Sequence, residues 1–218
     1  MKIGTDGVLL GSIAAGYPSG RILDAGAGCG LIALMVAQKN NGQITALDID
    51  PAAIRQATEN VIASPWADRI QVVHSSLQDY SQNSTRHFDL IVCNPPFFHN
   101  GLQSKCNQRN TARHSSMLPP GELVAAAKKL LSEKGRILLI IPADQDSLFN
   151  ELARKYSLFI TGRLWIISAP GKPPKRLILE FSGKNNITKE NSLVVEMKER
   201  HTYSDEYKKL TQDYYLNF

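Results

Sequence analysis

The sequence predicts an α/β fold in which a mostly parallel β-sheet carries helices on both faces. Short apolar segments typical of strands alternate with longer segments typical of helices along most of the chain. A glycine-rich turn follows the first apolar segment, as in folds that bind a nucleotide at the end of a parallel strand. No apolar run approaches the roughly 18 residues needed to cross a bilayer, so we expect no membrane partner.

The expected strands are short and rich in apolar residues. They cover residues 21–25, 43–47, 70–73, 88–93, 136–141, 158–167 and 176–181. Helices are expected over residues 31–38, 51–63, 119–131 and 145–155. Because the last two strands are close in sequence, we expect them to pair antiparallel at an edge of the sheet. Residues 183–192 are polar and are expected to form a loop.

The chain is long enough for one domain, which we expect to span residues 1–218. Residues 183–218 are expected to form a C-terminal appendage packed on the core. This appendage carries four tyrosines, Tyr203, Tyr207, Tyr214 and Tyr215. Aromatic residues recurring in an amphipathic segment are more often packing residues than base-stacking residues, so we expect them to dock the tail.

The composition indicates a modestly basic protein of a reducing compartment. There are 25 basic and 20 acidic residues, a net charge of +5, which permits an anionic partner without requiring one. The three cysteines lack the paired spacing of a zinc site, and the N-terminus lacks the features of a signal peptide. We therefore expect reduced thiols, no metal ion and a cytoplasmic location. A monomer is also expected, although nothing in the sequence decides the oligomeric state.

Two stretches, 90–121 and 161–179, carry basic residues but contain no acidic residue. The candidates for binding phosphate groups in them are Lys105, Arg109, Arg113, Lys172, Lys175 and Arg176. Two interpretations stay open. The stretches are either solvated loops or two edges of a surface that binds nucleic acid.

Residues Asn94 to Phe97 read Asn-Pro-Pro-Phe and directly follow an expected strand. Such a turn can hold a planar NH2 group. Asn94 offers a side-chain carbonyl, and Pro95 offers a backbone carbonyl whose direction is restricted by its own ring and by Pro96. Phe97 offers a flat face for stacking. We expect these four residues to be catalytic, although Asn-Pro is also a common start of a plain turn.

The glycine-rich turn reads Asp24-Ala25-Gly26-Ala27-Gly28-Cys29-Gly30. Glycines at Gly26 and Gly28 let the backbone turn tightly and approach a ligand. An acid before them would repel the pyrophosphate of a dinucleotide but suits a cationic amino-acid group. S-Adenosylmethionine carries an α-ammonium and a sulfonium, so Asp24 is expected either to hold the ammonium or to organise the turn that holds it.

The second expected strand ends in Asp48-Ile49-Asp50. An acid at this position, about 20 residues beyond the glycine turn, is placed to bind both ribose hydroxyls of a nucleotide. We assign that role to Asp48. Asp50 precedes Pro51 and is expected to be the N-cap of the following helix.

Together these features resemble the class I S-adenosylmethionine-dependent methyltransferases with an NPPF/Y motif. The resemblance implies a Rossmann-like fold with a seven-stranded, mostly parallel sheet and an antiparallel edge strand. It also implies that the loop after the third strand holds the cofactor adenine. Ser76 stands where an Asp is usual, and Asp79 is the alternative.

Three further segments make the resemblance more specific. They are the opening Met-Lys-Ile-Gly-Thr-Asp-Gly, the basic loop 108–114 and the tyrosine-rich tail 202–216. With them the chain resembles, over nearly its whole length, the bacterial tRNA1(Val) (adenine-37-N6)-methyltransferase family. Family members carry a short aromatic and basic segment ahead of the opening motif, at which this sequence begins.

That resemblance implies transfer of a methyl group from S-adenosylmethionine to N6 of adenosine 37 in the anticodon loop of a valine tRNA. It places Thr5, in the opening motif, among the cofactor contacts, and Asn94 beside both the cofactor and the base. Three alternatives are a ribosomal-RNA guanine-N2 methyltransferase, a protein-glutamine N5 methyltransferase and an inactive RNA-binding module.

Overall fold

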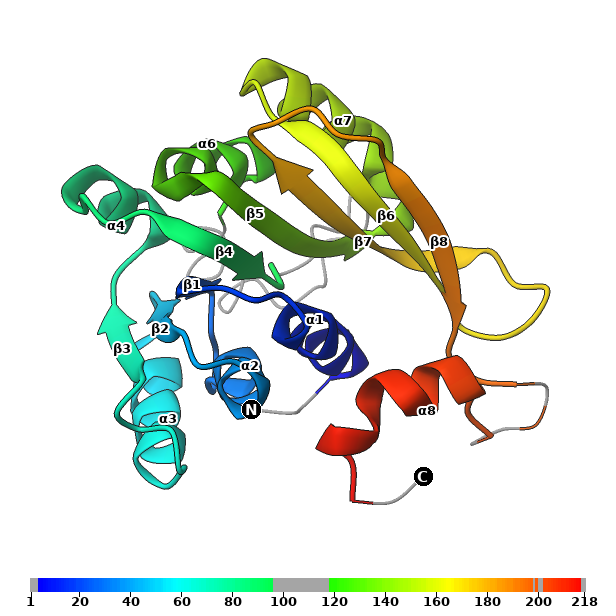
Figure 1. The fold of residues 1–218 in the computed structure, drawn as a ribbon, viewed down its shortest axis with the longest axis horizontal. Coiled ribbons are helices and arrows are strands. Elements are labelled where there is room, and N and C mark those ends of the chain that lie inside the picture. The colour runs from blue at the N-terminus through cyan, green and yellow to red at the C-terminus, as the bar shows by residue number, and fades with distance from the viewer. Residues whose placement is uncertain (1–3, 96–117, 198, 200–201, 217–218) are drawn as a thin grey trace, which may run out of the picture.

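The computed structural model describes residues 4–95, 118–197, 199 and 202–216, and Figure 1 shows their arrangement. One sheet of eight strands runs in the order β3-β2-β1-β4-β5-β7-β6-β8. The strands are β1 (Arg21–Ala25), β2 (Gln43–Asp48), β3 (Ile70–His74), β4 (Phe88–Cys93), β5 (Leu131–Pro142), β6 (Phe159–Ile167), β7 (Pro174–Ser182) and β8 (Lys189–Val194).

Helices cover both faces of this sheet (Figure 1). On one face lie α1 (Thr5–Ala15), α2 (Leu31–Lys39), α3 (Pro51–Ile62) and α8 (Asp205–Thr211). On the other lie α4 (Leu77–Asn83), α6 (Pro120–Leu130) and α7 (Asp146–Lys155). Short 3-10 turns, Ala143–Gln145 and Gln212–Tyr214, precede α7 and follow α8.

Apolar side chains of the central strands point alternately to the two faces of the sheet and contribute to two hydrophobic cores. In β5, Ile137 and Leu139 face the core under α6 and α7. The intervening Leu138 and Ile140 face the core under α1 and α2. Since successive side chains of a strand point to opposite faces, a strand buried on both faces is a continuous apolar run. This is why the strand pattern was predictable.

Seven strands were expected and eight are present, so the Rossmann-like class is confirmed and the strand count was one too low. The eighth strand, β8, begins inside the stretch expected to be a loop and pairs parallel with β6. The predicted antiparallel pairing of β6 with β7 is confirmed. The reversed strand β7 lies between β5 and β6, so it is not at the edge, because β8 continues the sheet beyond β6.

Helix α1 was not predicted from the sequence. Its Leu9 and Leu10 are fully buried, and its apolar residues surround the helix instead of forming one stripe. Two glycines allow α1 to lie close against α2. A Cβ added at Gly11 would lie 2.7 Å from Sδ of Met35, and one added at Gly7 would lie 3.2 Å from Cδ2 of Leu31. Glycine has a low helix propensity, so the two glycines made this segment look unlike a helix in the sequence.

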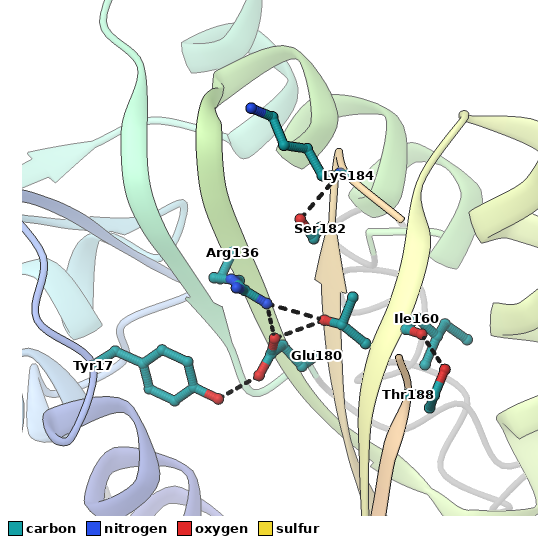
Figure 2. Close-up of polar contacts among 8 residues, drawn as sticks. Tyr17, Arg136, Ile160, Glu180, Ser182, Lys184 and Thr188 are labelled. Atoms are coloured by element: carbon teal, nitrogen blue, oxygen red, sulfur yellow. Dashed lines mark hydrogen bonds and ion pairs between the residues drawn. The ribbon is translucent and has the colours of Figure 1, made fainter. Parts of the chain in front are cut away.

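A polar cluster joins the loop after α1 to the sheet (Figure 2). The Glu180 carboxylate on β7 accepts hydrogen bonds from the hydroxyls of Tyr17 and Thr161 and from the Arg136 guanidinium. Burial disfavours ionisation of Glu180, but these bonds and the Arg136 charge together keep its pKa below its usual value. Burial, reinforced by the bond to Glu180, raises the pKa of Tyr17. The cluster therefore holds β5, β6 and β7 in register near the middle of β5.

The C-terminal tail packs against α1 and α2. Tyr207 is 2% exposed, which confirms its expected packing role, and it stacks on Tyr203 with ring centroids 5.3 Å apart. The Asp213 carboxylate pairs with Lys39 at 2.9 Å, and the Tyr214 hydroxyl donates to the Met35 carbonyl oxygen at 3.3 Å. Thr188, before β8, donates to the Ile160 carbonyl oxygen at 2.8 Å (Figure 2).

Candidate active site at the carboxyl edge of the sheet

A cavity of about 800 Å³ lies where the carboxyl ends of β1, β2, β3 and β4 meet. In parallel α/β sheets this edge is where ligands bind. Three of the loops predicted from the sequence contribute to it, carrying Gly26, Asp48 and Asn94. Among the described residues no group of His, Cys, Asp and Glu side chains has the arrangement of a metal site. In the same part of the chain, no helix has both the length and the hydropathy needed to cross a membrane.

The glycine turn has the backbone conformation that its residues suggest. Gly26 and Gly28 have φ values of 76° and 57°, in the region that L-residues other than glycine rarely adopt. The N–H groups of Gly26 and Ala27 both donate to the Leu47 carbonyl oxygen, at 2.8 and 2.9 Å. Space beside Gly26 is open where a Cβ would project, so the turn leaves room for a ligand against the backbone.

Asp24 lies directly behind this turn and is 1% exposed. Its Oδ2 accepts from the Ala33 N–H at 3.0 Å, while Oδ1 has no hydrogen-bond partner among the described residues. Burial raises the pKa of Asp24 from 3.8 to about 7, against the effect of the Ala33 bond. A buried carboxylate oxygen without a partner is costly, and a nearby cation would relieve that cost.

Asp48 organises the turn as well as lining the cavity. Its Oδ2 accepts from the Gly28 N–H at 2.8 Å, and its Oδ1 accepts from the Asp50 N–H at 2.9 Å. Each carboxylate oxygen keeps a second lone pair that can accept from a hydroxyl. Asp50 accepts from the Ala52 N–H at 2.9 Å, which confirms it as the N-cap of α3.

Ser76 and Asp79 both line the opposite wall of the cavity. Ser76 is the N-cap of α4, since its Oγ accepts from the Asp79 N–H at 3.0 Å. The Ser76 hydroxyl donates to Oδ2 of Asp79 at 2.6 Å. The two candidates are therefore one hydrogen-bonded unit, with Asp79 supplying the carboxylate and Ser76 holding it in place.

Asn94 and Pro95 lie at the mouth of the cavity, directly after β4. Pro96 and Phe97 lie outside the described residues. Helix α1 closes the space behind Asn94, because a Cβ on Gly7 would be 3.9 Å from its Nδ2. Gly7 was not singled out in the sequence. The only available sign was a glycine inside an apolar segment, which often marks a close approach.

The remaining predicted residues lie elsewhere. Thr5 does not line this cavity but a second one, together with Lys175 and Arg176. Arg176 pairs with Asp6 of α1 at 2.9 Å. Lys172 lies exposed in the loop between β6 and β7. Lys105, Arg109 and Arg113 fall outside the described residues.

Two apolar residues of the cavity were missed at the sequence level. Ile49 is 47% exposed, although it is a large apolar residue, and Leu77 of α4 also lines the cavity. Apolar walls with a few placed polar groups are typical of sites for small molecules. In the sequence, the position of Ile49 between the two acids Asp48 and Asp50 was the feature that could have indicated its place in the cavity.

Comparison with known proteins agrees with this geometry. Residues 3–156 match the family model described as methyltransferase small domain. A tRNA1(Val) (adenine(37)-N6)-methyltransferase from Bacteroides fragilis is 44% identical over 99% of this chain and 91% of its own length. One from Bacteroides thetaiotaomicron is 43% identical over 100% and 91%. The chain belongs to this methyltransferase family.

Solved structures show the same fold at low identity. A predicted O-methyltransferase from Agrobacterium tumefaciens superposes with a TM-score of 0.74 at 19% identity, covering 95% of this chain and 96% of that one. A ribosomal protein L11 methylase from Lactobacillus delbrueckii gives 0.57 at 19%, covering 82% and 77%. The fold of this methyltransferase is therefore shared with enzymes of several substrate classes, and the substrate must be argued from other evidence.

Proposed function

We propose that this methyltransferase transfers a methyl group from S-adenosylmethionine to N6 of adenosine 37 in the anticodon loop of a valine tRNA. The observation that carries the proposal is the full-length identity of 42–44% to relatives named for that reaction. The placement of Asn94 at the mouth of the cofactor-sized cavity supports it.

The cofactor is S-adenosylmethionine, which supplies an electrophilic methyl group on a sulfonium. The residues present fit it. Asp24 offers a buried carboxylate oxygen without a partner beside the open backbone at Gly26, suited to the α-ammonium. Asp48 offers acceptors for the ribose hydroxyls, and Asp79 with Ser76 offers acceptors for the adenine edge. Ile49 and Leu77 provide apolar walls for the ring.

Asn94 and Pro95 act on the other substrate. We assign the Asn94 side-chain carbonyl and the Pro95 backbone carbonyl as acceptors for the two N6 protons of the adenine. Accepting both protons favours a pyramidal nitrogen, whose lone pair then points at the methyl group. Pro96 and Phe97, which lie outside the described residues, are assigned to the same motif, and Phe97 is proposed to stack on the base, worth roughly 1–3 kcal/mol.

No general base is needed before methyl transfer. The N6 lone pair would form the new N–CH3 bond as the bond between sulfur and the methyl carbon breaks, leaving neutral S-adenosylhomocysteine. The cationic nitrogen would then release one proton to water. Orientation by Asn94 and Pro95 and fixed dipoles at the strand ends supply the acceleration. The target adenine must leave its stack, which costs less in an anticodon loop than in a duplex.

The RNA surface is proposed to include Lys105, Arg109 and Arg113 near the Asn-Pro-Pro-Phe turn and Lys172, Lys175 and Arg176 at the β6–β7 end. We also propose a cytoplasmic monomer, because tRNA is cytoplasmic and one chain supplies both Asp24 and Asn94. A single domain with its tail packed on the core is part of the same proposal, supported by the burial of Tyr207.

Methylation of total tRNA from a strain lacking the gene, followed by mass mapping of the modified nucleosides, tests the function. N6-Methyladenosine at position 37 of a valine tRNA is expected. N2-Methylguanosine in ribosomal RNA, or methylated glutamine in protein, would replace the proposal by one of its alternatives.

A further inference from the structure

A second cavity opens at the same carboxyl edge, between the start of α1, the ends of β6 and β8, and the C-terminal tail. Its volume of about 310 Å³ is at the lower end of the roughly 300–1,000 Å³ typical of small-molecule sites. The residues on which its chemistry depends are Thr5, Lys175, Glu196, Tyr203 and Tyr215. Tyr207 also lines the cavity, but it is buried and supports the other two tyrosines.

This cavity is adjacent to the methyl-transfer site. Thr5 lines it, and Gly7, two residues along the same helix, lies against Asn94. Two residues of an α-helix rise about 3 Å along its axis. The second cavity and Asn94 therefore both border the first turn of α1.

The lining combines the three groups that bind a single-stranded nucleotide. Tyrosine rings can stack on any base, and stacking is worth about 1–3 kcal/mol per base. Lys175 is exposed at the rim and suits a phosphate. Glu196 carries a carboxylate that can accept from the N–H groups of a base edge. Aromatic lining with one cation and one acid fits a base with its phosphate better than it fits a bare anion.

The cavity is also held in shape before any ligand binds. Asp6 and Arg176 both line it, and their ion pair joins α1 to β7. The Glu196 N–H donates to the Ser168 carbonyl oxygen at 3.0 Å, and the Tyr207 and Tyr215 hydroxyls are 3.1 Å apart. A preformed pocket avoids much of the ordering cost of binding.

We propose that this cavity binds the base of the nucleotide next to adenosine 37, and so helps to select the loop in which the target lies. The inference rests on the proposed function. It gives Thr5 a place in RNA binding, distinct from the cofactor contact expected from the sequence, and it gives the tyrosine tail a role beyond packing.

The test uses the full-length protein and synthetic anticodon stem-loops in which the nucleotide before or after adenosine 37 is abasic. One of the two abasic substrates is expected to raise KM about fivefold or more, since it loses one stacked base. The KM for S-adenosylmethionine should not change. If the intact stem-loop is methylated at adenosine 37 and neither abasic substrate changes KM, the inference fails while the proposed function stands.

Two variants connect the effect to the cavity. Ser168→Phe fills it, and Lys175→Ala removes the rim cation. Ser168→Phe should raise KM for the intact stem-loop and abolish the penalty of the abasic substrate. Lys175→Ala should raise KM for both substrates by the same factor. Lys134→Ala, an exposed lysine at the opposite edge of the sheet, is the matched control.

Thermal unfolding and circular dichroism identify any Ser168→Phe protein that fails to fold, in which case Ser168→Leu takes its place. The proposal would be overturned if a folded Ser168→Phe or Ser168→Leu protein still showed the full increase in KM with the abasic substrate. A KM change for Lys134→Ala equal to that for Lys175→Ala would also overturn the proposal. The effect would then come from the overall positive charge of the protein and not from this cavity.

Discussion

Gly7 of α1 lies against Asn94, with 3.9 Å between the position of an added Cβ and Nδ2 of the asparagine. The same Cβ would be 3.2 Å from Cδ2 of Leu31. Helix α1 thus packs beside Asn94. The tighter of the two contacts is the one to Leu31, and it is this contact that favours glycine at the position.

Replacing Gly7 with Val is expected to lower kcat at least tenfold by pushing Asn94 out of position. The dissociation constant for S-adenosylmethionine, measured by calorimetry, should change less than threefold, because the cofactor contacts lie on other loops. Gly4→Val is the control, since no atom lies within 4 Å of a Cβ there. A normal kcat for Gly7→Val would show that the close approach does not position Asn94.

Replacing Asn94 with Ala should abolish turnover and leave cofactor binding nearly intact. The lost carbonyl is one of the two acceptors assigned to the N6 protons, and removing one such donor or acceptor typically costs about 10²–10³ in kcat. A tritium-transfer assay measures the rate. Asn41→Ala, exposed at the opposite edge of the sheet, controls for the substitution type. Comparable methylation by the Asn94 variant would remove its catalytic assignment.

Replacing Asp48 with Asn should weaken cofactor binding about tenfold or more. The carboxamide has one acceptor oxygen, so it cannot accept from both the Gly28 and Asp50 N–H groups as the carboxylate does. Asp50→Ala should instead cost about 1 kcal/mol of stability through loss of the N-cap. Calorimetry and thermal unfolding separate the two effects. Equal losses of cofactor affinity in both variants would contradict the ribose assignment to Asp48.

Protonation of Asp24 should make stability depend on pH. Its pKa is about 7 in the folded chain and 3.8 ordinarily, so between these values the folded state holds a proton that the unfolded state has released. The resulting stabilisation is fully present below about pH 4 and is lost as pH rises through about 7. It amounts to a few kcal/mol at most, on the order of 1.4 kcal/mol per pKa unit.

Asp24→Asn should therefore remove this part of the pH dependence of the unfolding temperature and be more stable than the parent protein at pH 8. In the parent, affinity for S-adenosylmethionine should rise as pH increases through about 7, because the carboxylate form holds the ammonium. Asp68→Asn, at an exposed position, is the control. If cofactor affinity in the parent is the same at pH 6 and pH 8, Asp24 does not bind the ammonium.

Local chemistry explains which features the sequence predicted. Asp24 and Asp48 lie at the carboxyl ends of apolar strands, and Gly26 follows the first of them. Because the parallel order of the sheet brings these strand ends to one edge, their meeting could be expected. Helix α1 could not be predicted, because Gly7 lowers helix propensity and its value is apparent only beside Leu31 and Asn94. The start of strand β8 was expected to be a loop because its residues up to Ser192 are exposed and polar, and pairing with β6 makes them part of a strand.

The affinity for tRNA should fall steeply with salt, and the two lysines at the β6–β7 end should carry part of that dependence. Each phosphate contact adds about 0.7–0.9 to the slope of log affinity against log salt, so the Lys172→Ala, Lys175→Ala double variant should reduce the slope by up to about 2. Arg176→Ala should act differently. Its guanidinium pairs with Asp6, so its loss should loosen α1 and lower the unfolding temperature. Lys134→Ala with Lys189→Ala, at the other edge, should leave the slope unchanged. Filter binding between 50 and 300 mM KCl measures these slopes, and a flat dependence in the parent protein would exclude a phosphate-binding surface.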